Sequence, residues 1–332
     1  MIDSMSTANM RRLARPLKPL VDPIRSAARH RSQQRRTRRQ IRSAPAVVED
    51  ACGIRFIVYP EDRPSASFYV SRVEDRHTFS GISRLIGPGD VVFDVGAYIG
   101  IYSVFASRLV GEKGSVVAFE PVPTTHRRLR ETLTLNAVEN VAAVEAAVCD
   151  LVGTATMNVF EQRYAVWNSL GRPLMSDGRW RLAPNASVEV PATTIDAFCA
   201  ASGIERVNLL KVDVEGFERS VFLGAQRLLL NRSIDYICFE ISQDPLAGAG
   251  ATARGVFEAL ERFGYRAYRL RPGGAGFDGP ISDSTEYWAN YFASWRDLSA
   301  LRLGDRAPAQ EFEARLDAPR ASAQRAETGV RR

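Results

Sequence analysis

The stretch VVFDVGAYIG, residues 91–100, decides the fold. Its first five residues form a short apolar run typical of a buried strand. Gly96 and Gly100 then flank a tight turn, and a helical pattern continues to about Val110. Asp94 falls near the end of the predicted strand. The stretch therefore predicts a strand, a glycine-bounded turn and a helix, with one carboxylate beside the turn.

The same strand–helix alternation continues on both sides of this stretch. Strands are predicted at 53–60, 115–119, 141–148, 187–193, 207–216, 235–241, 265–270 and 287–294, and helices at 64–87, 124–135, 195–203, 217–230 and 254–263. Short apolar strands that alternate with amphipathic helices are typical of an α/β protein with a mainly parallel sheet covered on both faces. Ligands of such sheets bind beyond the carboxyl ends of the strands.

Glu120 ends the second strand of this series, in SVVAFEP, 20 residues after Gly100. An acidic residue at this place can accept hydrogen bonds from both ribose hydroxyls of a nucleoside. Alone, Glu120 could equally stabilise the start of the next helix through the helix dipole. The pairing with the turn at 96–100 favours ribose binding.

The turn itself has GxxxG spacing, whereas dinucleotide-binding folds use GxGxxG. Tyr98 also stands where a pyrophosphate would need open backbone. Both observations disfavour a nicotinamide-dependent oxidoreductase. After the third strand, Ala147 and Val148 could form an apolar wall for an adenine ring, although a plain core strand explains them as well.

The strand NLLKVDVEG, residues 208–216, carries charge in an apolar setting. Lys211, Asp213 and Glu215 alternate with apolar residues, so they would share one face while the strand continues. They form either a buried ion pair or part of an active site. Glu240 ends the neighbouring strand and either caps the next turn or faces the same cleft.

Carboxylates at the mouth of such a site can act as general bases. Asp213 is the first candidate for such a base and Glu240 the second, with Lys211 tuning either of them. No resident metal is expected, since Asp213 and Glu240 have no evident third ligand. Asn168 and Ser169 either line the acceptor pocket or form a loop turn, and Trp167 either stacks on a sugar or packs in the core.

Composition restricts the class of protein. The 332 residues are 45% hydrophobic and 25% charged, an ordinary globular balance. Neither an apolar run of membrane-spanning length nor a secretory signal is recognisable. The four cysteines lack CxxC spacing and indicate reduced thiols of a cytoplasmic protein.

Residues 1–45 hold 12 basic and two acidic residues, which predicts a disordered tail able to contact an anionic surface such as a membrane or nucleic acid. A lead-in of 46–88, a catalytic domain of 89–298 and a weakly ordered tail of 299–332 would follow. Residues 151–187 look irregular and are interpreted as an insertion or lid that contains Trp167 and Trp180.

Seven segments together resemble the FkbM family of S-adenosylmethionine-dependent methyltransferases. They are FDVGAYIGIYS, AFEPVPTTHRRLRETLTLN, EAAVCD, VPATTIDAF, NLLKVDVEGFERSVFLGAQRLL, YICFEIS and NYFAS. The resemblance implies the class I methyltransferase fold, a Rossmann-like three-layer sandwich with a mostly parallel seven-stranded sheet whose last strand is antiparallel. It also implies that Asp94, Gly96 and Gly100 hold the methionine part of the cofactor and Glu120 its ribose. The candidate cofactor residues are Asp94, Gly96, Ala97, Tyr98, Gly100, Glu120, Pro121, Ala147 and Val148.

The resulting hypothesis is an O-methyltransferase that acts on a hydroxyl of a carbohydrate or of a glycosylated or polyketide-type metabolite. Its candidate catalytic residues are Asp213, Glu240, Lys211 and Glu215. Two alternatives remain open at this point: an RNA methyltransferase that uses the basic tail, and a membrane-associated binding protein with a degenerate site. The partner expected under the main hypothesis is a small-molecule or glycan acceptor with a free hydroxyl.

Overall fold

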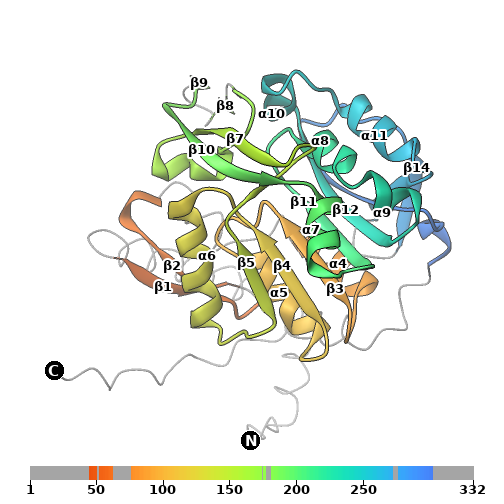
Figure 1. Cartoon of the computed structure of the whole chain (residues 1–332), viewed down its shortest axis with the longest axis horizontal. Helices are drawn as coiled ribbons and strands as arrows, with labels where there is room; N and C mark the ends of the chain where they lie inside the picture. The colour runs from red at the N-terminus through yellow and green to blue at the C-terminus, as the bar shows by residue number, and fades with distance from the viewer. Residues whose placement is uncertain are drawn as a thin grey trace, which may run out of the picture.

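The computed structural model describes residues 45–50, 52–62, 76–173, 175–176, 181–271 and 276–301 (Figure 1). The basic segment 1–44, most of the C-terminal segment and Trp180 lie outside these residues. The centre is one eight-stranded sheet. Its strands, in spatial order, are β5 (Val141–Val144), β4 (Ser115–Phe119), β3 (Val91–Val95), β11 (Val207–Val212), β12 (Ile234–Ser242), β15 (Trp288–Ser294), β13 (Arg266–Leu270) and β14 (Phe277–Ile281).

Five neighbouring strands, from β5 to β12, run parallel to one another. β15 is antiparallel to both β12 and β13, which confirms the expected antiparallel last strand. The sheet has eight strands instead of the expected seven, because β14 adds an antiparallel edge strand beside β13. Its sequence FDGPI contains glycine and proline, which disfavour strands in general but are tolerated at a sheet edge.

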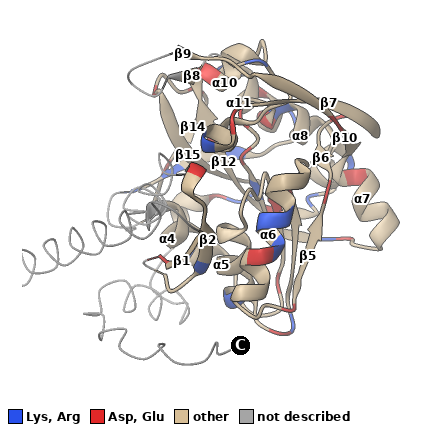
Figure 2. Cartoon of the chain, turned by 90° about the vertical axis from the view of Figure 1, so that its left-hand side faces the viewer, with Lys and Arg blue, Asp and Glu red and all other residues tan. Residues whose placement is uncertain are grey.

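Helices cover both faces of the sheet, as the apolar strands require. One core cluster joins alternate strand residues such as Val92 to the helices α4 (Arg76–Leu85), α5 (Ile101–Val110) and α6 (Pro123–Leu135). The other joins Phe93 and Val95 to the helices α7 (Ile195–Ser202), α8 (Glu218–Leu223), α9 (Gln226–Leu230) and α11 (Ala253–Glu261). In Figure 2 the ribbon of α6 is blue and red at its basic and acidic positions. The three-layer sandwich is therefore confirmed.

One predicted helix is divided. The pattern FERSVFLGAQRLLL suggests a continuous helix, but α8 ends before Gly224 and α9 begins at Gln226. A Cβ atom on Gly224 would lie only 2.1 Å from the carbonyl oxygen of Cys149. The glycine thus allows the chain to pass close to the segment after β6, and the helix breaks there.

The described residues of the 151–187 segment (151–173, 175–176 and 181–187) are more ordered than predicted. β7 (Gly153–Val159) pairs antiparallel with β10 (Ala186–Thr193), and β10 pairs in parallel with β6 (Ala147–Val148). The chain therefore leaves the main sheet after β5, and the single strand expected at 141–148 is wrong. Between β7 and β10 lie the 3₁₀-helix η2 (Gln162–Trp167) and the short strands β8 (Met175–Ser176) and β9 (Arg181–Leu182).

The remaining elements lie at the two ends of the described chain. The lead-in contains the hairpin β1 (Ala46–Glu49) and β2 (Arg55–Val58), followed by η1 (Pro60–Asp62). α10 (Gln243–Gly248), which the sequence did not predict, follows β12 directly, and η4 (Leu298–Ala300) follows β15. Within the described part of the chain, no helix has the length and apolar character needed to cross a membrane.

Candidate active site

The turn between β3 and α5 forms one side of the candidate site. Gly96 has a φ of +79°, and a Cβ atom there would lie 1.8 Å from the carbonyl oxygen of Asp213. Its N–H and that of Ala97 donate to the carbonyl of Phe119, at 3.1 and 2.9 Å. The ends of β3, β4 and β11 are thereby held together, which only a residue without a side chain at position 96 permits.

Glu120 faces this turn, as predicted. Its Oε2 accepts a hydrogen bond from the Tyr98 N–H at 3.0 Å, and its Oε1 accepts one from the Val122 N–H at 3.0 Å. The residue is 6% exposed. Burial raises the pKa of Glu120 to about 8, although the two backbone hydrogen bonds act in the opposite direction. A hydroxyl-rich ligand that supplies further donors would favour the ionised form.

A cleft with about 560 Å³ of empty space, part of it open to solvent, lies beyond the carboxyl ends of β3 and β4. Six predicted cofactor residues line it: Gly96, Tyr98, Glu120, Pro121, Ala147 and Val148. Asp213 and Glu215 line it as well. Six of the nine predicted cofactor-binding residues and two of the four predicted catalytic residues thus share one cleft.

Three predicted cofactor residues, Asp94, Ala97 and Gly100, are not among the residues that line this cleft. Asp94 is 1% exposed and accepts a hydrogen bond from the Ser103 hydroxyl at 2.6 Å. Its other carboxylate oxygen lies 3.4 Å from Lys211 Nζ. Asp94 therefore contacts Lys211, one of the predicted catalytic residues, and its predicted cofactor role stays a prediction.

The opposite wall comes from the segment that looked irregular in the sequence. Met157 of β7 and Ala165, Val166, Asn168 and Leu170 in or after η2 line the cleft. Of these five residues, the sequence indicated only Asn168. Met157 was missed because the alternation in GTATMNV is too weak to predict a strand. Trp167 stacks on Tyr164, with ring centroids 5.0 Å apart and planes 4° from parallel. This packing favours its structural interpretation.

Lys211 lies between two carboxylates. Its Nζ is 3.2 Å from Asp213 Oδ2 and 3.4 Å from Asp94 Oδ1, and it lies 4.6 Å from the centre of the Tyr102 ring. Burial alone would lower the pKa of Lys211, but the charges of Asp213 and Asp94 outweigh burial and raise the pKa. Lys211 therefore stays a cation, and the buried Lys211–Asp213 pair that the sequence left open is present.

Three carboxylates meet where β11 and β12 end. One oxygen from each of Asp213, Glu215 and Glu240 lies within 4.8 Å of the others. β11 ends at Val212, so Glu215 does not continue the strand alternation and instead has a φ of +52°. No third metal ligand beside Asp213 and Glu240 was evident from the sequence. The structure places Glu215 there, and oxygen ligands at this spacing suit a divalent cation.

Crowding of acidic groups changes their protonation. Burial, followed by the charge of Asp213, raises the pKa of both Glu215 and Glu240 well above the usual range. Burial also raises the pKa of Glu218, at the start of α8, to about 7. A carboxylate with a raised pKa is a stronger base once it is ionised, which suits proton removal from a hydroxyl.

The sheet order, the antiparallel β15 and the buried acid that ends β4 define a class I methyltransferase fold. Residues 94–267 match the methyltransferase FkbM domain, and the chain belongs to that family. The resemblance noted from the sequence segments is thus confirmed.

Several curated proteins are similar to this chain over part of its length. The 31-O-demethyl-FK506 methyltransferase FkbM of Streptomyces tacrolimicus is 33% identical over 162 residues, which cover 42% of this chain and 60% of that protein. The hexuronic acid methyltransferase AglP of Haloferax volcanii is 27% identical over 158 residues, covering 46% and 56%. The 2-O-methyltransferase NoeI of Sinorhizobium fredii is 23% identical over 189 residues, covering 55% and 75%. The chain thus spans less than two thirds of the first two relatives.

The cofactor of the family is S-adenosylmethionine, and the site fits it. Apolar side chains and the carboxylate of Glu120 line the cleft, and the side-chain-free surface at Gly96 allows close approach. Glu120 would bind the ribose, and Ala147 and Val148 would border the adenine. The cofactor supplies a methyl group on a positively charged sulfur, already activated for displacement.

Proposed function

We propose that this protein is an O-methyltransferase that methylates a hydroxyl of a carbohydrate or glycosylated metabolite. The observation that carries the proposal is the group of carboxylates at Asp213, Glu215 and Glu240 beside the cofactor cleft. Carboxylates orient sugar hydroxyls and accept their protons. The names of the relatives that act on 31-O-demethyl-FK506, on hexuronic acid and at a 2-O position support methylation of a hydroxyl.

Within this proposal, Glu240 is the general base. Lys211 pairs with Asp213, so the Asp213 carboxylate is already held in an ion pair. Glu240 is 9% exposed, and its raised pKa makes it the stronger base. Asp213 and Glu215 would orient the acceptor hydroxyl, and Lys211 would hold Asp213 in place. Alignment of the hydroxyl with the methyl group supplies much of the remaining rate acceleration.

The test is methyl transfer from S-adenosylmethionine to a panel of sugars and glycosides, read as formation of S-adenosylhomocysteine and of a product heavier by one methylene. With the acceptor so found, Glu240→Gln should lower turnover by about 100-fold or more, the range expected for loss of a general base. Glu258→Gln is the control, because Glu258 lies in an exposed ion pair with Arg254 on α11.

Two outcomes would contradict the proposal. Full turnover in Glu240→Gln would exclude Glu240 as the base. Methylation of RNA in the same assay, with every hydroxyl acceptor of the sugar panel inert, would replace the carbohydrate acceptor with a nucleic acid.

A further inference from the structure

Ser169, in the segment between β7 and β10, makes an unusual long-range contact. The residue is 1% exposed. Its hydroxyl donates to the carbonyl oxygen of Glu215 at 2.6 Å and accepts a hydrogen bond from the Gly171 N–H at 3.0 Å. The hydroxyl therefore has a fixed direction, and a side chain 46 residues away holds the backbone of Glu215.

The backbone that presents Ser169 is itself anchored. The N–H and carbonyl of Ser169 pair with those of Asn158 in β7, at 3.0 and 2.8 Å. The side chain of Asn158, which is 5% exposed, donates to the carbonyl of Gly171 at 2.8 Å. These hydrogen bonds hold Ser169 against the three-stranded sheet of β6, β10 and β7. The Ser169 hydroxyl connects that sheet to the loop after β11.

Glu215 needs such support because its conformation is uncommon for a residue with a side chain. Its φ is +52°. On the inner side of the loop, Glu218 Oε1 accepts hydrogen bonds from the N–H groups of Val214 and Gly216, at 3.3 and 3.1 Å. The Ser169 hydroxyl holds the same loop at the carbonyl of Glu215. Both contacts therefore hold the backbone from which the Glu215 side chain projects.

The charge of that carboxylate has a consequence for cofactor binding. Around Asp213, Glu215 and Glu240 the cationic group that the structure places is Lys211, which Asp94 already shares. S-adenosylmethionine carries a positive sulfonium, whereas its product S-adenosylhomocysteine is a neutral thioether. A negative charge in a partly buried cleft attracts the donor more strongly than the product.

We propose that Ser169 is a positioning residue that holds the Glu215 carboxylate at the cleft, where its negative charge favours the methyl donor over the demethylated product. The inference rests on the proposed function for the location of the reaction, but it concerns cofactor binding and does not depend on the acceptor. It assigns to the 151–187 segment a role in releasing the product.

The experiment measures the dissociation constants of S-adenosylmethionine and S-adenosylhomocysteine by calorimetry, without acceptor, at about pH 8.5. Burial and the charge of Asp213 raise the pKa of Glu215, so an alkaline pH shifts this residue towards its carboxylate form. We expect Glu215→Gln and Ser169→Ala each to reduce the preference for the donor by about threefold to tenfold, as expected for loss or displacement of one charge in a partly screened site.

Ser294→Ala is a matched control. Ser294 is fully buried, its hydroxyl donates to the carbonyl of Asp235 at 2.7 Å, and it accepts from the Arg296 N–H at 3.1 Å. It repeats the hydrogen-bond pattern of Ser169 at the other end of the sheet. Ser294→Ala should lower thermal stability about as much as Ser169→Ala but leave the donor-to-product preference within about twofold.

Three results would overturn the inference. Ser169→Ala could retain the wild-type preference, Ser294→Ala could change the preference as much as Ser169→Ala, or Glu215→Gln could leave it unchanged. Failure of the carbohydrate panel alongside the expected preferences would refute the proposed acceptor alone. The two proposals can therefore fail separately.

Discussion

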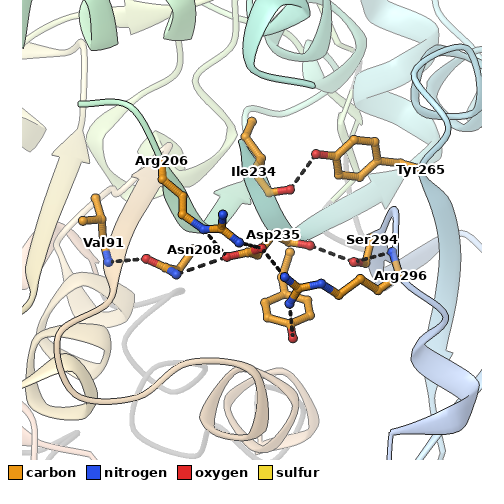
Figure 3. A network of polar contacts seen from close by, with 9 residues as sticks. Val91, Arg206, Asn208, Ile234, Asp235, Tyr265, Ser294 and Arg296 are labelled. Atoms are coloured by element: carbon orange, nitrogen blue, oxygen red, sulfur yellow. Dashed lines mark hydrogen bonds and ion pairs between the residues drawn. The ribbon is translucent and has the colours of Figure 1, made fainter. Parts of the chain in front are cut away.

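Acidic residues at the two ends of the central sheet differ in how many cationic partners they have. At the amino end, Asp235 is 3% exposed and satisfied on every side (Figure 3). Arg206 Nε donates to its Oδ2 at 2.9 Å, Asn208 donates to the same oxygen at 3.1 Å, and an Arg296 nitrogen lies 3.1 Å from Oδ1. One carboxylate there has two guanidinium partners.

At the carboxyl end the acidic groups outnumber their cationic partners. Asp213, Glu215 and Glu240 crowd together, and Lys211 is the cation paired with this group in the described structure. Like charges brought together out of water destabilise a fold unless they are neutralised by protons or by a ligand. The difference indicates that the amino end serves stability, whereas the carboxyl end gives up stability to bind and react.

The largest expected effect is on the pH dependence of stability. In the unfolded chain Glu120 has a pKa near 4.5, and in the folded chain about 8. The folded state therefore binds the extra proton between these values, and the free energy of unfolding should fall as pH rises through this window, by up to about 5 kcal/mol from Glu120 alone.

Thermal or urea denaturation from pH 5 to 9 measures this slope. Glu120→Gln, which has no carboxylate to ionise, should have a shallower slope than the wild type. Equal slopes in the two proteins would show that Glu120 is not the group responsible.

Asp235→Ala should produce the next largest effect. It removes the shared partner of Arg206 and Arg296, and because both guanidinium groups are about half exposed, the loss should be about 2–3 kcal/mol. Urea denaturation measures it. Cofactor affinity of the folded variant should remain that of the wild type, and a weakened affinity would contradict the separation between the two ends.

Glu120→Gln should weaken S-adenosylmethionine binding by about 10- to 100-fold, since hydrogen bonds from the ribose to a charged group are worth about 1.5–3 kcal/mol. Calorimetry checks the affinity. Glu189→Gln is a suitable control, because Glu189 is a carboxylate on β10 in contact with Thr156 and is not among the residues that line the cleft. An unchanged affinity in Glu120→Gln would remove the ribose assignment.

The smallest effect is expected for Arg206→Ala. Asp235 would keep Arg296 and Asn208, and Arg206 is about half exposed, so the loss should be about 1 kcal/mol. Urea denaturation at low and at high salt measures it. A loss as large as that of Asp235→Ala would mean that Arg206 alone satisfies the carboxylate.

The sequence predicted the parts of the site that depend on strand ends. The apolar runs before Gly96 and Glu120 show where two strands stop, and parallel strands bring their ends to one edge. The strand predicted at 207–216 instead ends at Val212, before Asp213. The sequence did not predict β14 or β7, because edge and half-exposed strands carry weaker alternation. Nor could it place Asp94 against Lys211, since a contact between different strands depends on register.

The hydrogen bond from Ser169 to Glu215 has a practical consequence for engineering. Exchanging the segment between β7 and β10 with that of a relative is an obvious way to alter which acceptor fits. Such a graft would also replace the support of a charged loop on the main sheet, and so change how readily the spent cofactor leaves. Chimeras should therefore keep a hydroxyl donor at position 169 if turnover is to survive the change of substrate.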